Sequence, residues 1–340
     1  MTDETSGVAA CRPPIARREP VKRVFHGDAV IDPYEWMRDK QSPEVRDYVA
    51  AQNAYCDARM AGLAGLRGTL FDELKAHVQE TDMSVPVRMD GYWYFARTRE
   101  GSQYAVQCRV PVRGEDDWTP PEVGGAGDEG GSAVGAGSLP GEQVVFDTNR
   151  EAEGHDFFAL GGLSVSKDGR WMLYGVDTRG DERYDFRIRD LDTGDELPER
   201  LEGIGAACFT PDARWVFYVT LDDAWRPCEV EQDEVVFHED DERFWVGVGM
   251  SFDEHSIVIC SASKTSSEVW MLPTATPEGE FSVFIARKDD VEYDVSFACF
   301  EGAGADGADI PVAVVYHNAQ DPNFEIDVID MRTHQPPYTL

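Results

Sequence analysis

Apolar residues recur at helical spacing near the start of this chain, within the stretch "SPEVRDYVAAQNAYCDARM" at residues 42–60. The positions that share one face of the predicted helix are Val45, Tyr48, Val49, Gln52, Tyr55 and Arg59. Ser42 is expected to cap this helix with its side chain, and Pro43 suits the first turn, where a missing N–H has no cost. Gly62 and Gly65 are predicted to interrupt the helix before a second one at residues 66–80. Residues 1–80 are therefore predicted to form an extended arm followed by helices.

From Val85 onward the apolar period shortens to two residues, as in "VRMDGYWYFARTREGSQYAVQCRV" at residues 87–110. Such alternation predicts strands, and Asp90-Gly91 and residues 99–101 supply turn chemistry between them. Residues 81–340 are therefore predicted to form a second, mostly β domain. Within it, residues 114–141 are so rich in Gly, Pro, Ala and acids that they cannot bury enough apolar area to offset their ordering entropy. A disordered surface loop is predicted there.

Three segments of the β region repeat one pattern: "SKDGRWMLYGV", "TPDARWVFYVT" and "SFDEHSIVICS". Their aspartates, Asp168, Asp212 and Asp253, are 44 and 41 residues apart, and each follows a Ser or Thr by two positions. The runs that follow are apolar on both faces, which is typical of strands buried within a stack of sheets. A spacing of ~40 to 50 residues is typical of propeller blades.

With residues 87–110 and 293–330 added, the pattern gives about five blade-like units of an incomplete β-propeller. A β-sandwich or an irregular all-β domain is the alternative. The terminal "MRTHQPPYTL" contains no visible closing strand.

Composition narrows the classes of partner. The 340 residues contain 31 Lys and Arg against 65 Asp and Glu, a net charge of −34, which disfavours nucleic acid and membrane surfaces as partners. A solvated acidic exterior explains this charge better than attraction of cationic substrates does. The seven cysteines are scattered without a C-x-x-C pair, and the chain shows no secretory leader or membrane span. A cytoplasmic protein with reduced thiols is the expectation.

Candidate chemistry is sparse. The G-x-S-x-G elbow that an α/β-hydrolase nucleophile requires does not occur in the chain. His238 in "HEDDE" could be imagined as a metal ligand, but a solvated acidic turn is the favoured interpretation. His26 beside Asp28 and His155 beside Asp156 could each be half of an acid/base pair, although structural histidines are more common. We therefore predict no catalytic residue, no cofactor and no metal site in this chain.

Several long motifs carry a resemblance to a known family. The stretches "PPIARREP", "HGDAVIDPYEWMRD" and "SPEVRDYVAAQNAY" resemble the amino-terminal arm of the prolyl oligopeptidase family of serine peptidases, and more closely its oligopeptidase B branch. The same likeness extends through "AEGHDFFALGGLSVSKDG", "TRGDERYDFRIRDLDTGDEL" and "FTPDARWVFYVTLDDAWRP" to "DERFWVGVG" and "SKTSSEVW". The resemblance covers nearly the whole chain outside the Gly-rich loop.

This resemblance implies an arm, a seven-bladed propeller and a carboxyl-terminal α/β-hydrolase domain with a Ser-Asp-His triad. Residues 20–80 would then pack on the hydrolase domain as a clasp. Its packing and hydrogen-bonding residues would be Asp32, Pro33, Tyr34, Trp36 and Arg38. The segment after "AWRPCEV" looks short for the family, so one outer strand is expected to be clipped there.

The chain departs from the family pattern because about two blades and the α/β-hydrolase domain are absent from it. No triad residue, oxyanion donor or specificity pocket can be assigned to any position here. The expectation is therefore the amino-terminal portion of a peptidase that cleaves short, basic peptides after Arg or Lys. Its propeller would select substrates by size, and the portion alone would be inactive and prone to aggregation. A stand-alone propeller that acts as a protein-interaction scaffold is the alternative, and a propeller hydrolase of another chemistry is a third.

Overall fold

The computed structural model describes residues 12–114, 116–121, 138–232, 234–303 and 307–332. The chain divides into two compact units, residues 1–79 and residues 80–340, which are described separately below. Most of the predicted Gly-rich loop, residues 122–137, lies outside the described residues, as do the terminal residues 333–340.

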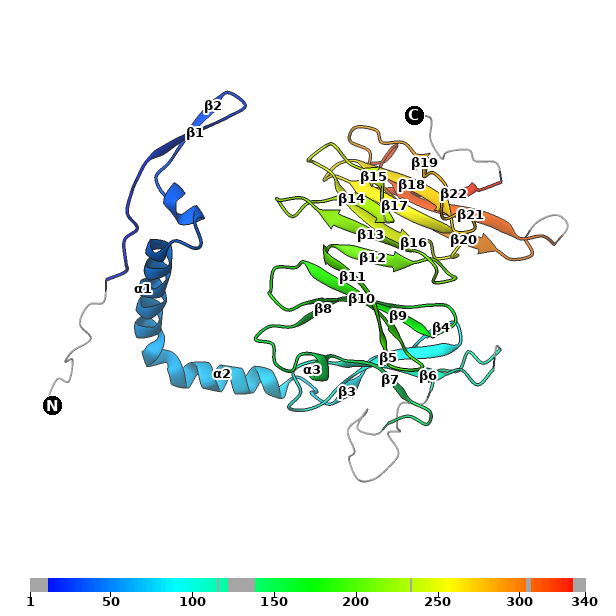
Figure 1. Cartoon of the computed structure of the whole chain (residues 1–340), viewed down its shortest axis with the longest axis horizontal. Helices are drawn as coiled ribbons and strands as arrows, with labels where there is room; N and C mark the ends of the chain where they lie inside the picture. Colours follow the sequence, from blue (N-terminus) through cyan, green and yellow to red (C-terminus); the bar gives the residue numbers. More distant parts are fainter. Residues whose placement is uncertain (1–11, 115, 122–137, 233, 304–306, 333–340) are drawn as a thin grey trace. The chain divides into compact units, whose positions relative to one another are not determined.

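The first unit contains a hairpin and two helices, drawn from blue to cyan in Figure 1. Its elements are β1 (Val21–Phe25), β2 (Asp28–Asp32), the 3-10 helix η1 (Glu35–Arg38), α1 (Pro43–Met60), η2 (Ala61–Leu63) and α2 (Ala64–Ala76). His26 and Gly27 both adopt positive φ, 51° and 90°, as a two-residue hairpin turn requires. Part of the predicted extended arm is therefore a hairpin.

Both predicted helices form, with two local corrections. The Ser42 side chain makes no capping hydrogen bond, and its backbone carbonyl instead accepts the Arg46 N–H at 3.2 Å. The two glycines interrupt the helix less than expected, because Gly62 lies in the three-residue η2 and Gly65 is already inside α2. The three residues of η2 are the whole break between α1 and α2. The second helix therefore begins at Ala64, two residues earlier than predicted, and it ends at Ala76.

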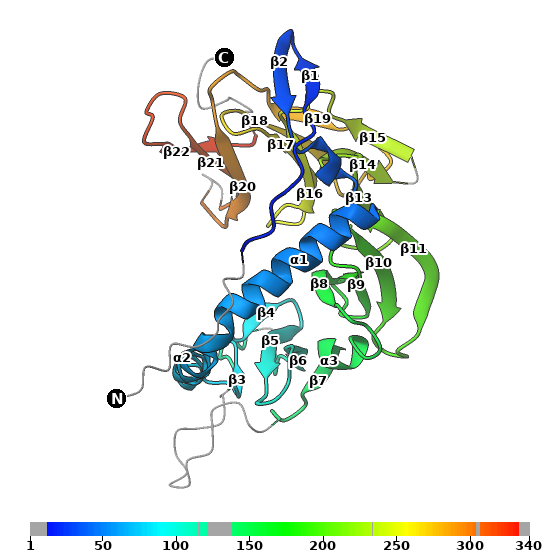
Figure 2. The same cartoon turned by 90° about the vertical axis from the view of Figure 1, so that its left-hand side faces the viewer.

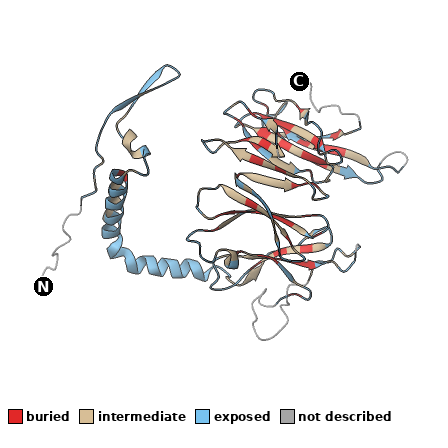
Figure 3. Cartoon of the chain, viewed as in Figure 1, coloured by how far each residue is buried: buried red, intermediate tan, exposed pale blue. Residues whose placement is uncertain are grey.

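The apolar positions of these helices are mostly exposed within the described chain. Val45 is the buried residue of α1, and α2 has none, as its pale blue colour in Figure 3 shows. Phe71 and Leu74 on α2 are 65% and 69% exposed. The expected apolar face is thus present in the sequence but is not covered.

The segment predicted to form a clasp is held together inside this unit. Trp36 Nε1 donates to the Arg17 carbonyl at 2.9 Å, and the Trp36 ring meets the Tyr48 ring edge to face. The Tyr34 N–H donates to Asp32 Oδ1 at 2.8 Å, and Gln52 Nε2 on α1 donates to the Pro14 carbonyl at 3.0 Å. These contacts fix the arm along η1 and α1.

The second unit consists of five antiparallel sheets, named blades 1 to 5 in chain order (Figures 1 and 2). Blade 1 contains β3 (Asp82–Met83), β4 (Val87–Met89), β5 (Tyr92–Thr98), β6 (Val106–Pro111) and β7 (Gln143–Asp147). After the short α3 (Thr148–Glu151), blade 2 contains β8 (Ala159–Val165), β9 (Trp171–Asp177), β10 (Tyr184–Asp190) and β11 (Glu196–Ile204).

The three remaining sheets follow the same up-and-down order. Blade 3 contains β12 (Ala206–Phe209), β13 (Val216–Leu221), β14 (Pro227–Gln232) and β15 (Glu234–His238). Blade 4 contains β16 (Trp245–Met250), β17 (Ser256–Ala262), β18 (Ser267–Pro273) and β19 (Ser282–Ile285). Blade 5 contains β20 (Tyr293–Phe300), β21 (Ile310–His317) and β22 (Glu325–Asp330). The predicted architecture of about five propeller blades after a helical segment is confirmed.

The outer strand of blade 3 is present in the structure. This strand was expected to be clipped after "AWRPCEV", but β15 pairs with β14 from Glu229↔His238 to Gln232↔Glu234.

The repeated Ser/Thr-x-Asp pattern forms the same turn in blades 2, 3 and 4. In each, the hydroxyl donates to the carboxylate two residues later, at 2.5, 2.6 and 2.7 Å, and accepts the backbone N–H that opens the next strand. The pairs are Ser166–Asp168, Thr210–Asp212 and Ser251–Asp253. The pattern therefore specifies the turn between the first and second strands of a blade.

Stacking of the blades explains the strands that are apolar on both faces. In β9, Met172, Leu173 and Tyr174 are at most 1% exposed, because successive residues face neighbouring blades. Between blades 3 and 4, one cluster joins Phe217, Val219, Val230, Val246, Ile257, Ile259 and Leu272. Packing is so close at Gly175 in β9 that an added Cβ would lie 2.3 Å from the Phe186 ring.

Candidate functional site

The first strands of successive blades form the inner layer of the propeller, because β12 contacts both β8 and β16. Alternation along β16 directs Val246 into the core, while Trp245, which is 60% exposed, lies on the opposite side together with Gly247 and Gly249. A Cβ added at either glycine would meet nothing within 4 Å. In a propeller the first strands of the blades lie nearest the central channel. Blade 4 therefore presents one large ring and bare backbone there.

Turns from three blades converge at one end of this inner layer. Lys167, in the first turn of blade 2, forms an ion pair with Glu254 in the equivalent turn of blade 4. Asp90, in the β4–β5 turn of blade 1, is close enough that Glu254 contributes to raising its pKa, after the larger effect of burial. The hydrogen bond to Glu254 raises the pKa of Lys167. Two carboxylates and one ammonium thus give this axial turn cluster a net negative charge.

A buried ion-pair network lies in blade 4 and corrects the prediction for "HEDDE". Glu239 is only 5% exposed and accepts hydrogen bonds from Arg287, from Ser261 Oγ at 2.6 Å and from the Asp241 N–H at 3.0 Å. Burial acts to raise the pKa of Glu239, but these hydrogen bonds outweigh it and hold the pKa below its ordinary value. The segment was predicted to be a solvated turn, yet one of its carboxylates is a structural anchor.

The histidines considered for chemistry lie apart from one another. His238 contacts Glu229 at 2.8 Å and Asp240 at 3.2 Å on the surface. His26 occupies the turn of the first-unit hairpin, and the ring of His155 lies 6.1 Å from that of Phe158. In the part of the chain that the structure describes, no group of three or more His, Cys, Asp or Glu side chains is arranged to hold a metal ion.

Sequence reasoning missed His317. It is fully buried on β21, and its Nε2 lies 3.0 Å from Asp327 Oδ2 on β22. Because β21 and β22 are neighbouring strands, this contact between His317 and Asp327 ties them together in blade 5. The alternating pattern of β21 marks the position as inward-facing, so a buried polar residue could have been read from the sequence.

The ordered hydroxyls and thiols are set up for packing. Ser166, Ser251 and Ser261 all donate to carboxylates that themselves anchor turns or ion pairs. Burial raises the pKa of Cys208 to about 12, and burial followed by Glu142 raises that of Cys108 to about 12. These thiols stay protonated at neutral pH and are poor nucleophiles. The hydroxyls and carboxylates described above are thus engaged in holding turns and blades together, and the cluster of Asp90, Lys167 and Glu254 is acidic.

Comparison with known proteins identifies the family of this chain. The model of the prolyl oligopeptidase N-terminal beta-propeller domain matches residues 13–301. The chain belongs to this family. The resemblance seen in the sequence motifs is therefore confirmed, and the five blades are part of a prolyl oligopeptidase propeller.

Relatives within the family are considerably longer than this chain. Dipeptidyl aminopeptidase BI of Pseudoxanthomonas mexicana is 36% identical over 307 residues, which are 86% of this chain and 41% of the relative. Protease 2 of Moraxella lacunata is 28% identical over 83% of this chain and 40% of its own length. The chain thus spans about two fifths of these relatives.

Solved structures agree with this placement. Oligopeptidase B from Trypanosoma brucei, in a closed form with covalently bound antipain, matches 94% of this chain and 45% of its own with a TM-score of 0.76 and 26% identity. Oligopeptidase B from Leishmania major matches with a TM-score of 0.77 at 23% identity, a likeness of fold.

No helix among the described residues has the length and apolar character to cross a membrane.

Proposed function

We propose that these 340 residues are the propeller portion of an oligopeptidase B-like serine peptidase that cleaves short peptides after Arg or Lys. The observation that carries the proposal is the family match over residues 13–301, combined with a span of only about two fifths of the peptidase relatives. By family, the chemistry belongs to a Ser-Asp-His triad on an α/β-hydrolase domain, and no residue of this chain is assigned to it. The proposal includes a cytoplasmic location, which scattered, unpaired cysteines favour.

The propeller's part in this function is to admit substrates by size and charge. A folded protein cannot pass a channel lined by stacked blades, whereas an extended peptide can. The acidic axial turn cluster of Asp90, Lys167 and Glu254 and the net charge of −34 would draw cationic peptides toward the channel. Electrostatic steering of this kind weakens as salt screens it, because the Debye length falls to about 8 Å at physiological ionic strength.

Two experiments test the proposal. The purified 340-residue chain is incubated with a fluorogenic peptide that contains Arg, and no signal is expected because the nucleophile lies outside these residues. Turnover that persists through purification would refute this assignment. For the longer protein that carries a hydrolase domain, the ratio of cleavage rates for Arg-containing and neutral peptides should fall as salt rises. A ratio that does not respond to salt would contradict the role of the acidic channel.

A second candidate activity has its own support. Dipeptidyl aminopeptidase BI is a relative of higher identity than protease 2, 36% against 28%. An aminopeptidase of that type requires a free substrate amino terminus, whereas an endopeptidase does not. The longer protein with a hydrolase domain can be assayed on one peptide with a free and with an acetylated amino terminus, which distinguishes the two activities. Release of dipeptides from the free form alone indicates the aminopeptidase. Equal cleavage of both forms indicates the endopeptidase.

A further inference from the structure

An open groove lies on the propeller between blades 3 and 4, and it is separate from the axial turn cluster. It has a volume of about 880 Å³ and is bordered by β15, by the end of β14 and by the loop that joins β18 to β19. Gln232 Nε2 donates to the Pro277 carbonyl at 3.2 Å and so connects the two sides of the groove. The packing between the two blades therefore holds its shape.

The floor of the groove is aromatic. Its rings are Trp215, Phe237, Trp270 and Phe281, all of them half-buried. Phe237 meets Trp270 edge to face at 5.4 Å, and Phe281 meets the buried Phe217 at 5.9 Å. Because these contacts fix the rings from below, their outer faces form a rigid apolar surface.

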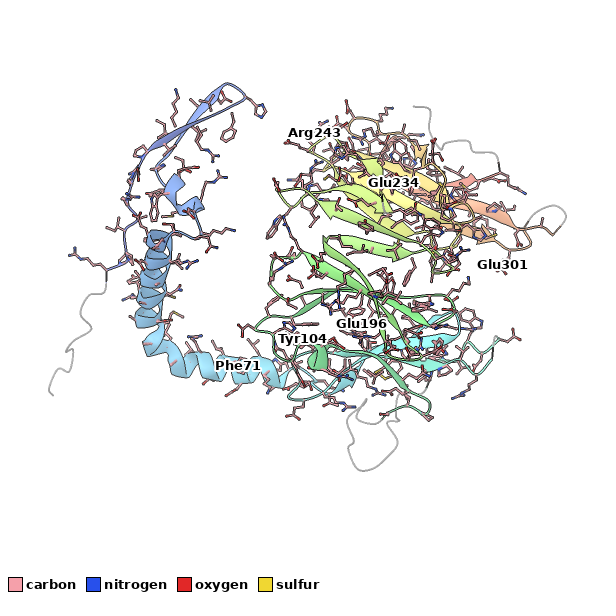
Figure 4. The ribbon with its side chains drawn as sticks, in the orientation of Figure 1. Phe71, Tyr104, Glu196, Glu234, Arg243 and Glu301 are labelled. Carbon is pink, nitrogen blue, oxygen red and sulfur yellow. The ribbon has the colours of Figure 1, made fainter. Side chains whose placement is uncertain are left out.

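Among the described residues that line the groove, none is basic, and the rim is acidic. Its three carboxylates are Glu234, Glu278 and Glu280, which are exposed and form no ion pair with a described residue; Glu234 is labelled in Figure 4. Elsewhere arginines lie over several tryptophans, as Arg170 does over Trp171 at 4.7 Å. The groove thus combines negative charge with ring faces to which no described cation is bound.

One wall of the groove is an open sheet edge. β15 is the last strand of blade 3, and among the described strands it pairs with β14 alone, since the order of that sheet is β12-β13-β14-β15. Val235, its second residue, is 52% exposed. An edge strand presents unpaired backbone N–H and carbonyl groups, to which an extended peptide can add as a further strand.

We propose that this groove binds an extended, basic peptide segment, which adds to the edge of β15 and places its Arg or Lys side chains between the aromatic floor and the acidic rim. Charge complementarity indicates a basic occupant, because three glutamates that form no ion pair with a described residue surround rings suited to cation–π contact. Its extended form is specified by the backbone edge. The site lies outside the channel, so the inference holds or fails independently of the peptidase function proposed above.

The test uses the 340-residue chain and calorimetric titration with the peptide acetyl-Thr-Arg-Thr-Lys-Thr-Arg-amide. Saturable binding is expected in about 50 mM salt and weaker binding in about 200 mM salt. The variant E278Q/E280Q should bind about fivefold more weakly, because two exposed charge contacts are lost. V235K, which places a cation on an exposed edge position, should weaken binding at least as much.

The matched control is E153Q/E301Q, which removes the same charge from exposed glutamates outside the groove; Glu301 is labelled in Figure 4. This control should bind as the unaltered chain does. Equal weakening by control and groove variants, equal binding of a peptide with Glu in place of its Arg and Lys, or no binding at all would overturn the proposal. Dissociation of a dimer by V235K without peptide binding would assign the groove to a second copy of the chain and would also overturn it.

Discussion

Removal of Arg287 should destabilise the propeller more than removal of any exposed arginine. Arg287 Nη2 contacts both Glu239 and Glu268, the latter at 3.1 Å, and its guanidinium lies 3.9 Å from the Phe244 ring centre. Glu239 and Glu268 are 5% and 9% exposed, so Arg287→Ala would leave two buried carboxylates without their counter-ion. Breaking a buried pair costs about 3 to 5 kcal/mol. Because the Arg287 side chain is itself 30% exposed, we expect about 3 kcal/mol.

The assay is urea unfolding of the 340-residue chain, followed by tryptophan fluorescence and circular dichroism at pH 7. Arg243→Ala is the matched control, since Arg243 makes a similar fork to Asp241 but its side chain is 74% exposed. It should leave the unfolding midpoint unchanged. A loss below about 1 kcal/mol for Arg287→Ala, or an equal loss for the control, would refute the reasoning.

The pH dependence provides an independent check. Burial acts to raise the pKa of Glu239 in the folded chain. The hydrogen bonds from Arg287 and Ser261 outweigh this effect and keep the pKa below its ordinary value. A depressed pKa contributes stability that is present above the unfolded pKa of about 4.3 and is lost as pH falls through the folded value. The unaltered chain should therefore lose this contribution as the pH falls below about 4.3, and its advantage in stability over Arg287→Ala should shrink. A difference that stays constant over this range would contradict the assigned cause.

Three further predictions concern packing, turns and thiols. Gly175→Ala should destabilise the chain by about 1 to 3 kcal/mol in urea unfolding because its Cβ would overlap a phenyl ring, whereas Gly247→Ala, which faces open space, should not. Asp168→Ala should lower the free energy of unfolding by about 1 kcal/mol, because the Ser166 hydroxyl and the Arg170 N–H lose their acceptor. An unchanged urea midpoint would show that the Ser166–Asp168 pair is dispensable. Cys108 is 2% exposed, and burial followed by Glu142 raises its pKa to about 12, so it should react with a disulfide reagent at pH 8 only on unfolding. Exposed Cys56 should react at once, and equal rates for the two thiols would contradict this prediction.

Local pattern was sufficient for much of this fold. The Ser/Thr-x-Asp repeat predicted a turn that recurs with the same hydrogen bonds in three blades, because those bonds form within five residues of sequence. Strands with two apolar faces predicted stacked sheets, since a neighbouring sheet on each side covers both faces. The helices of the first unit followed from their spacing and from Pro43, although the apolar face they share with Phe71 is left uncovered.

Contacts between distant segments could not be read in this way. Glu239 sits in an acidic run that looks solvated, and only the fold brings Arg287, 48 residues away, to bury and pair it. Lys167 and Glu254 meet across 87 residues because two equivalent turns converge at one end of the inner layer. The groove between blades 3 and 4 likewise combines rings from four separate segments. The sequence alone determined the strands, the helices and their order, because these depend on residues close together in the chain. The tertiary structure decided which charges are buried and which surfaces stay open, because that depends on how the blades stack.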